Sequence, residues 1–113
     1  MQRELIKNIN TINSSIDLLC SSINRRRDEI TLIAVSKKKS FDLIKIALEN
    51  GINNFGENYA QELQEKSSLI DSDNIVWHFI GPIQSNKVKV IANNADWIHT
   101  CLLYTSDAAD DIP

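Results

Sequence analysis

The sequence predicts an α/β protein in which four strands alternate with helices. Four short apolar runs, rich in β-branched or aromatic residues, start at positions 31, 52, 75 and 97, so successive runs are 21, 23 and 22 residues apart. Strands that alternate with helical segments at such a steady interval are typical of βαβ units and a parallel sheet. The interval fits a (β/α)8 barrel, which usually needs about 250 residues, so this chain of 113 residues is expected to form the N-terminal half of one, with four βα units. A four-stranded open sheet of the flavodoxin type is the alternative.

A long amphipathic helix is predicted before the first strand. Six aliphatic side chains recur at steps of three and four residues, which places them on one stripe of a helix: Leu5, Ile9, Ile12, Ile16, Leu19 and Ile23. The helix is expected to end near Asn24. The arginines at positions 25–27 fit this end, because cations are stabilised by the negative pole of the helix dipole.

The next three helices are predicted from the signals at their ends. Ser40 is a suitable N-cap and Gly51 a suitable C′ residue for the second helix. Asn58 is the expected cap of the third helix, which continues to the polar cluster at 71–74. The Gly-Pro pair at 81–82 interrupts the chain before the fourth helix.

Composition and charge exclude several functional classes. The net charge of −3 gives no general attraction to nucleic acid or to an anionic membrane surface. The longest apolar runs are strand-sized and too short to span a bilayer, and no apolar targeting segment follows the first residues. Cys20 and Cys101 lack the C-x-x-C spacing, which favours free thiols in a reducing compartment. The chain is therefore expected to be cytoplasmic.

The candidate site residues follow or end the predicted strands. Lys37 comes directly after the first strand, Asn58 after the second, and His78 lies in the third. In parallel α/β proteins the carboxyl ends of the strands face the ligand site, and a lysine at the edge of an apolar interior loses its proton readily enough to act as an amine nucleophile. Solvated charge in the run of three lysines at 37–39, and a structural histidine in the core, are the alternatives. The residues alone thus indicate a ligand site with a Schiff-base lysine.

Three blocks of sequence resemble the pyridoxal phosphate homeostasis protein family. They are LIAVSK at 32–37, NFGENY at 54–59 and WHFIGPIQSNK at 77–87, and their order and separation also match. The similarity extends from about residue 5 to residue 100.

The resemblance implies a single-domain barrel similar to the N-terminal domain of alanine racemase, which is the fold of type III pyridoxal 5'-phosphate (PLP) proteins. It implies that PLP is held as a Schiff base on Lys37, with Asn58 and His78 near the cofactor ring. It further implies a PLP carrier that acts in vitamin B6 homeostasis, without catalysis of its own and without a metal, and that has PLP-dependent apo-enzymes as partners. The family's phosphate-binding loop belongs to later strands that are absent from these 113 residues.

Two regions are expected on this basis. Residues 1–100 form the partial PLP-binding barrel domain. Residues 101–113 have no amphipathic period and end in an acidic segment, so they are expected to be a tail outside the family sequence, either disordered or an artefact of sequence assembly. The inward-facing side chains of the half barrel, expected to be Leu32, Val35, Trp77 and Phe79, are predicted to lack half of their packing partners.

Three alternative functions remain open at this point. The first is a type III PLP enzyme such as an amino-acid racemase, which needs a second acid–base residue from another domain. The second is a Schiff-base aldolase on a full barrel, for which added PLP forms no imine at Lys37. The third is a truncated fragment without function.

Overall fold

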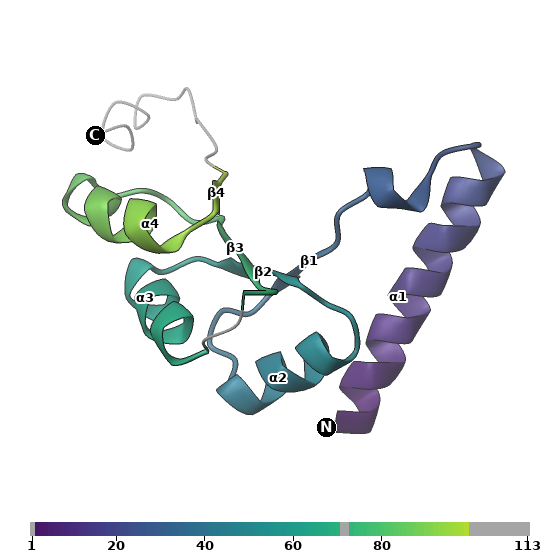
Figure 1. The fold of residues 1–113 in the computed structure, drawn as a ribbon, viewed down its shortest axis with the longest axis horizontal. Coiled ribbons are helices and arrows are strands. Elements are labelled where there is room, and N and C mark those ends of the chain that lie inside the picture. Colours follow the sequence, from purple (N-terminus) through teal and green to yellow (C-terminus); the bar gives the residue numbers. More distant parts are fainter. Residues whose placement is uncertain (1, 71–72, 100–113) are drawn as a thin grey trace.

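The chain folds into a parallel sheet with helices packed on one face (Figure 1). The computed structural model describes residues 2–70 and 73–99. Its elements are α1 (Gln2–Ser22), η1 (Arg27–Glu29), β1 (Ile33–Val35), α2 (Phe41–Glu49), β2 (Asn54–Glu57), α3 (Ala60–Leu69), β3 (Val76–Phe79), η2 (Ser85–Lys87), α4 (Val88–Asn94) and β4 (Trp97–Ile98), where η marks a 3-10 helix. The predicted α/β class with four strands is confirmed.

The strand order supports the barrel rather than the flavodoxin-type sheet. Each strand pairs in parallel with the next strand along the chain, in the order β1-β2-β3-β4. A flavodoxin-like sheet reverses its order after the first two strands, whereas a barrel adds each strand beside the previous one. The described strands therefore form a continuous arc of the kind from which a (β/α)8 barrel is built.

The core lies between the sheet and helices α2, α3 and α4. Phe55 of β2 and Phe79 of β3 are 1% exposed, and both belong to one cluster with buried aliphatic residues from each helix, namely Ile44, Leu63 and Ile91. Successive strand residues point to opposite faces of the sheet, so the apolar sides of the helices cover every second strand residue. We call this side of the sheet the helix face.

The opposite side, which we call the open face, carries Val35, Asn54, His78 and Trp97. Val35, Gly56 and His78 are register partners on adjacent strands, and His78 is in turn paired with Trp97. Val35 on β1 is 50% exposed and Trp97 on β4 is 59% exposed, whereas His78 on β3 between them is only 4% exposed.

The expected orientation of two strand residues is wrong. Trp77 and Phe79 were expected to face inward and to lack half of their partners, but they are buried on the helix face, where the Trp77 ring lies 5.9 Å from the Phe55 ring. Leu32 also packs partly against the core. Only Val35 is exposed as expected, because strand alternation places His78 rather than its aromatic neighbours on the open face.

The predicted helix boundaries are correct at two of the three capped ends. The Ser40 side chain accepts a hydrogen bond from the Leu43 N–H at the start of α2, and Gly51 after its end has a φ of +93°. Asn58, in contrast, is not the cap of α3. That helix begins at Ala60 with Tyr59 in the N-cap position and without a side-chain cap.

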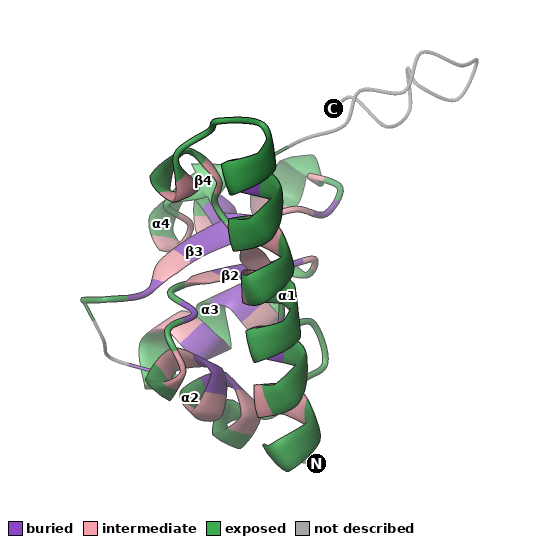
Figure 2. Ribbon diagram, turned by 90° about the vertical axis from the view of Figure 1, so that its right-hand side faces the viewer, coloured by how far each residue is buried: buried purple, intermediate pink, exposed green. Residues whose placement is uncertain are grey.

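Helix α1 forms where it was predicted, but only part of its apolar stripe is covered (Figure 2). Ile9 is buried in the core near α2, whereas Ile12, Leu19 and Ile23 are exposed. The helix ends at Ser22, close to the expected Asn24, whose φ of +57° breaks the helical path.

Some expectations fall on residues that are not described. The tail at 101–113, with Cys101, lies outside the described residues. Cys20 is buried and free. Among the described helices, none has the length and apolar character needed to cross a membrane.

Candidate functional site

Lys37 lies at the carboxyl end of β1, in the turn that leads to α2. The preceding residue extends the strand pairing, since the Ser36 N–H donates to the backbone oxygen of Gly56 at 2.9 Å. The Lys37 side chain is exposed and, among the described residues, makes no ion pair or side-chain hydrogen bond. Its amine is therefore available to a ligand at this edge of the sheet.

Asn58 occupies the matching position after β2. Val35 and Gly56 are register partners, and Lys37 and Asn58 each follow two residues later. The side-chain oxygen of Asn58 is buried and has no hydrogen-bond partner among the described residues. Its backbone oxygen lies so near Gly81 that a Cβ there would approach it to 2.2 Å. The backbone at Gly81, which follows β3, therefore packs directly against the backbone of Asn58.

His78 lies one step deeper, in the same row as Val35 and Gly56. One ring nitrogen, Nε2, is 2.8 Å from Asn54 Oδ1, and the other, Nδ1, is 2.9 Å from His99 Nε2. The ring also stacks on Trp97 at 6.4 Å between centroids. Burial lowers the pKa of His78 below its ordinary value, and the neighbouring His99 lowers it further, against the attraction of Asp96.

The three predicted residues share an edge of the sheet but do not touch one another. Lys37 and Asn58 lie just beyond the ends of β1 and β2, while His78 is inside β3, about 7 Å lower along the strand direction. Among the described residues, the direct partners of His78 are Asn54 and His99. Neither residue was predicted as a partner of His78, although the alternation of the strands places all three on one face.

A buried ionic cluster beneath the Lys37 turn was also missed. It consists of Ser36, Glu57, Glu62 and Lys66, which we call the turn cluster. Lys66 Nζ, on α3, donates to Glu57 Oε2 and to Glu62 Oε2, both at 2.9 Å. The Ser36 hydroxyl donates to the same Glu57 oxygen. The i,i+4 spacing of Glu62 and Lys66 was the available sequence signal, but nothing in it indicated that Lys66 is buried.

The charged side chains of the turn cluster are buried or partly buried and bind one another. Lys66 and Glu57 have side chains that are 6% and 0% exposed. Burial alone would raise the pKa of the Glu62 carboxyl, yet hydrogen bonds from Lys66 and from the Lys38 N–H, with the Lys66 charge, hold that pKa below its ordinary value. The second carboxylate oxygen of Glu57 has no hydrogen-bond partner among the described residues.

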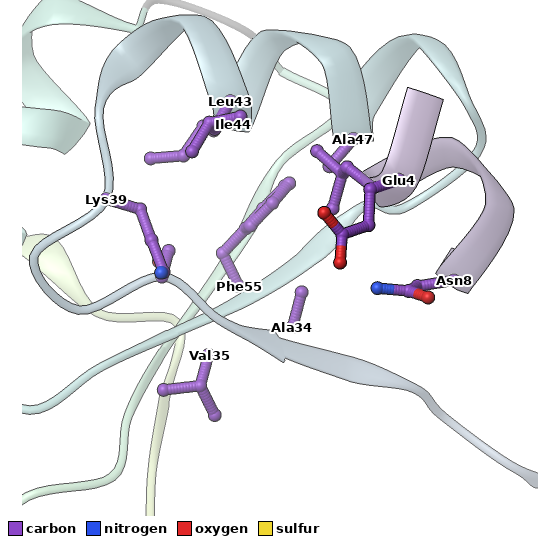
Figure 3. Close-up of a pocket in the computed structure, with 11 residues that line it drawn as sticks. Glu4, Asn8, Ala34, Val35, Lys39, Leu43, Ile44, Ala47 and Phe55 are labelled. Carbon is purple, nitrogen blue, oxygen red and sulfur yellow. The ribbon is translucent and has the colours of Figure 1, made fainter. Parts of the chain in front are cut away.

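Two cavities of about 270 Å³ lie near the strand ends, and neither encloses Lys37. The first lies between α1, α2 and β1 and is lined mainly by apolar side chains such as Leu43 and Phe55, with Lys39 at its edge (Figure 3). The second is lined by Asn58 and Tyr59 and lies against Lys87. Lys37 is not among the residues that line either of these cavities, and its side chain is exposed.

Curated relatives match most of the chain. It is 47% identical over 94 residues to the pyridoxal phosphate homeostasis protein of Buchnera aphidicola from Schizaphis graminum, a match that covers 82% of this chain and 41% of the relative. The protein of the same name from Haemophilus influenzae is 43% identical over 95 residues, covering 82% of this chain and 40% of the relative. The chain therefore spans about two fifths of the length of these relatives. No family model matches it.

A solved structure has the same fold. PipY of Synechococcus elongatus, determined with PLP bound, superposes with a TM-score of 0.62 at 33% identity. The superposition covers 86% of this chain and 45% of PipY. The four-stranded arc of this chain is thus similar to part of a protein that binds PLP.

Proposed function

We propose that the chain is part of a protein of the pyridoxal phosphate homeostasis protein family, and that it provides the cofactor-bearing part of a PLP-binding protein, with PLP attached to Lys37. The observation that carries this proposal is the position of Lys37: an exposed amine, free of ion pairs among the described residues, directly after the first strand of a parallel sheet. PipY, which resembles the chain in fold and sequence, has been solved with PLP.

The residues at the edge of the sheet fit such a cofactor. Bound PLP supplies an aldehyde that condenses with a lysine amine, with loss of one water, and a ring that draws electrons from the resulting C=N bond. Lys37 provides the amine. Asn58, which is partly exposed, follows β2 at the position that matches Lys37, so its amide is a second polar group close to this edge. We infer that the phosphate is held by residues of the family barrel beyond this chain, since the relatives are more than twice as long.

We further propose that the protein does not catalyse a reaction on PLP adducts. Catalysis needs an acid or base that can exchange protons with the reacting atoms. His78 is the candidate on the open face, but both of its ring nitrogens already contact Asn54 and His99. Burial, and then the neighbouring His99, lower its pKa, which disfavours the protonated ring that could donate a proton. These contacts favour a role in holding the sheet edge over a role in proton transfer.

On this basis the whole protein acts as a PLP carrier in vitamin B6 homeostasis. The names of the relatives support this role. The partners that we propose are PLP-dependent apo-enzymes, which would accept the cofactor. The buried, free thiol of Cys20 agrees with the reducing cytoplasm that we propose as its location.

The proposal is tested by measuring PLP binding. Residues 2–99 replace the matching segment of the Haemophilus influenzae relative, and PLP is titrated into this hybrid and into the 113-residue chain. In the hybrid, Lys37→Arg is expected to abolish the yellow absorbance of bound PLP, because Arg keeps the charge but cannot form the C=N bond. Lys39→Arg, two residues away, serves as the matched control and should bind as before. Equal loss in both variants, or none in either, contradicts attachment at Lys37.

The absence of catalysis is tested on the same hybrid loaded with PLP. Racemisation of alanine and serine should stay at the background rate of free PLP. A rate that exceeds this background and disappears in Lys37→Arg would establish the racemase alternative instead.

A further inference from the structure

We propose that Lys66 and Glu62 are positioning residues for Lys37, since they fix the turn that carries its amine. The inference rests on the proposed attachment of PLP at Lys37. Neither residue touches the Lys37 side chain in the described structure. They act on the residues immediately before and after it.

Two side chains of α3 bind the backbone of the residues immediately before and after Lys37. Lys66 Nζ donates to the backbone oxygen of Ser36 at 2.5 Å, and Glu62 Oε2 accepts from the backbone N–H of Lys38 at 2.8 Å. The two side chains are joined to each other by an ion pair of 2.9 Å. One helix therefore ties both neighbours of Lys37 through a single charged pair.

The turn needs such support because of its backbone. Lys38 has a φ of +59°, in the left-handed region that side-chain-bearing residues rarely adopt. A residue persists there only when the surrounding structure holds it. The N–H of Lys39 donates to the oxygen of Ser36 at 3.1 Å and closes the turn, but this bond leaves the Lys38 N–H to Glu62. When this acceptor is lost, the turn is expected to relax.

Burial makes the support rigid. Glu57, at the end of β2, lies beneath the turn with a side chain that is 0% exposed, and it binds both Lys66 and the Ser36 hydroxyl. A buried ion pair gains little net stability, because desolvation offsets the attraction, but it penalises every arrangement in which a charge loses its partner. The turn cluster thus selects one position for the turn, and with it one starting point for the Lys37 side chain.

A fixed turn matters for a covalent ligand. An amine held where the aldehyde of a bound cofactor lies reacts as if at high local concentration, and this advantage falls when the amine samples a wider volume. Lys38 and Lys39 offer two further amines within the same turn. The turn cluster is therefore expected to raise the affinity for PLP at Lys37 and to keep the attachment specific to that lysine.

The first test needs no cofactor. Hydrogen exchange of the Lys38 amide is measured in the 113-residue chain, in Glu62→Gln and in Glu65→Gln, a control three residues further along α3 that faces solvent. Loss of the charged acceptor should accelerate exchange at Lys38 by about tenfold, while Glu65→Gln leaves it unchanged. Unchanged exchange in Glu62→Gln overturns the inference, and so does equal acceleration in both variants.

The second test measures PLP binding in the hybrid described above. Lys66→Met removes the ammonium but keeps much of the side-chain length, and it should weaken PLP binding by about tenfold or more. Lys66→Arg keeps a cation and should restore part of the affinity, which a loss of packing alone would not explain. Lys45→Met, at an exposed position of α2, is the matched control. If Lys66→Met does not fold, Glu62→Gln takes its place, because its side chain is partly exposed.

The outcomes separate this inference from the proposed function. PLP binding in Glu62→Gln and Lys66→Met at the affinity of the unsubstituted hybrid overturns the positioning role while Lys37 remains the attachment site. Absence of PLP at Lys37 in the unsubstituted hybrid contradicts the proposed function itself, and the positioning role with it.

Discussion

The two faces of the sheet differ in how completely this chain covers them. On the helix face, Phe79 is 1% exposed and packs in a cluster to which α2, α3 and α4 all contribute. On the open face, Val35 and Trp97 are half exposed or more, and His78, which contacts His99, is buried on β3 between their strands. The helix face therefore contains the apolar core that packs the helices on the sheet, whereas the open face carries the histidine pair.

The largest expected change in the free energy of unfolding comes from a substitution on the helix face. Phe79→Ala should lower the free energy of unfolding by about 3–5 kcal/mol, because it leaves a cavity in a fully packed core. Val35→Ala, on the open face, should cost less than about 1 kcal/mol, since half of its surface is already in water. Urea unfolding of the chain measures both. Similar losses for the two variants would mean that the open face is covered in solution.

A smaller loss of stability is expected from a substitution at Gly81, just after β3. Gly81→Ala places a Cβ 2.2 Å from the backbone oxygen of Asn58, so the strand ends must move apart. The free energy of unfolding should fall by about 1–3 kcal/mol. Gly56→Ala is the comparison, because its Cβ would meet side-chain atoms, Ile80 Cδ1 at 3.0 Å and Ile33 Cγ2 at 3.2 Å, rather than the backbone, and it should cost less. The reverse order would show that the edge is looser than the strand interior.

The smallest expected effect is a pH dependence that arises on the open face. The pKa of His78 is lower in the folded chain than in the unfolded one, because burial and His99 oppose its charge. Below the unfolded pKa, near 6.5 for an ordinary histidine, the unfolded chain binds more protons, so stability decreases as the pH falls. The midpoint of urea unfolding should therefore be lower at about pH 5.5 than at about pH 7.5.

The contribution of His78 is isolated by substitution. His78→Gln keeps a polar side chain that can contact Asn54 but does not titrate in this range, so the difference between the two pH values should shrink. The pKa of Glu62 is also lowered in the folded chain, so its contribution to stability is lost only at more acidic pH. It should not affect the difference between these two pH values. A full pH dependence in His78→Gln would assign the effect to another group.

The sequence predicted the elements better than the faces on which their residues lie. The even spacing of the apolar runs identified four βα units, and Ser40 and Gly51 marked the ends of α2 as the structure has them. Trp77 and Phe79 were assigned to the wrong face, because a continuous apolar run shows no alternation that distinguishes one side from the other. In the fold, Trp77 is the register partner of Phe55 on the neighbouring strand, and both rings face the helices.

The positions of candidate residues relative to the strands were predictable from the sequence, but the contacts between distant residues were not. Lys37, Asn58 and His78 were predicted as site residues from their places in or after the strands, and the structure brings Lys37 and Asn58 to one edge of the sheet. The turn cluster was not predicted, because Lys66 reads as an exposed helix residue until Glu57, nine residues earlier on β2, is placed beneath it. Likewise, the partner of His78 is His99, 21 residues away, which only the pairing of β3 with β4 brings near.

The position of the cofactor on the chain is tested most directly by trapping it. PLP bound to the hybrid is reduced with borohydride, which converts the C=N bond to a stable secondary amine, and the digested protein is analysed by peptide mass spectrometry. The account predicts that the label is on Lys37, with Lys38 and Lys39 essentially unmodified, although the three lysines are adjacent. Label found mainly on Lys38 or Lys39, or spread evenly over all three, would contradict the assignment of Lys37 as the residue that holds PLP.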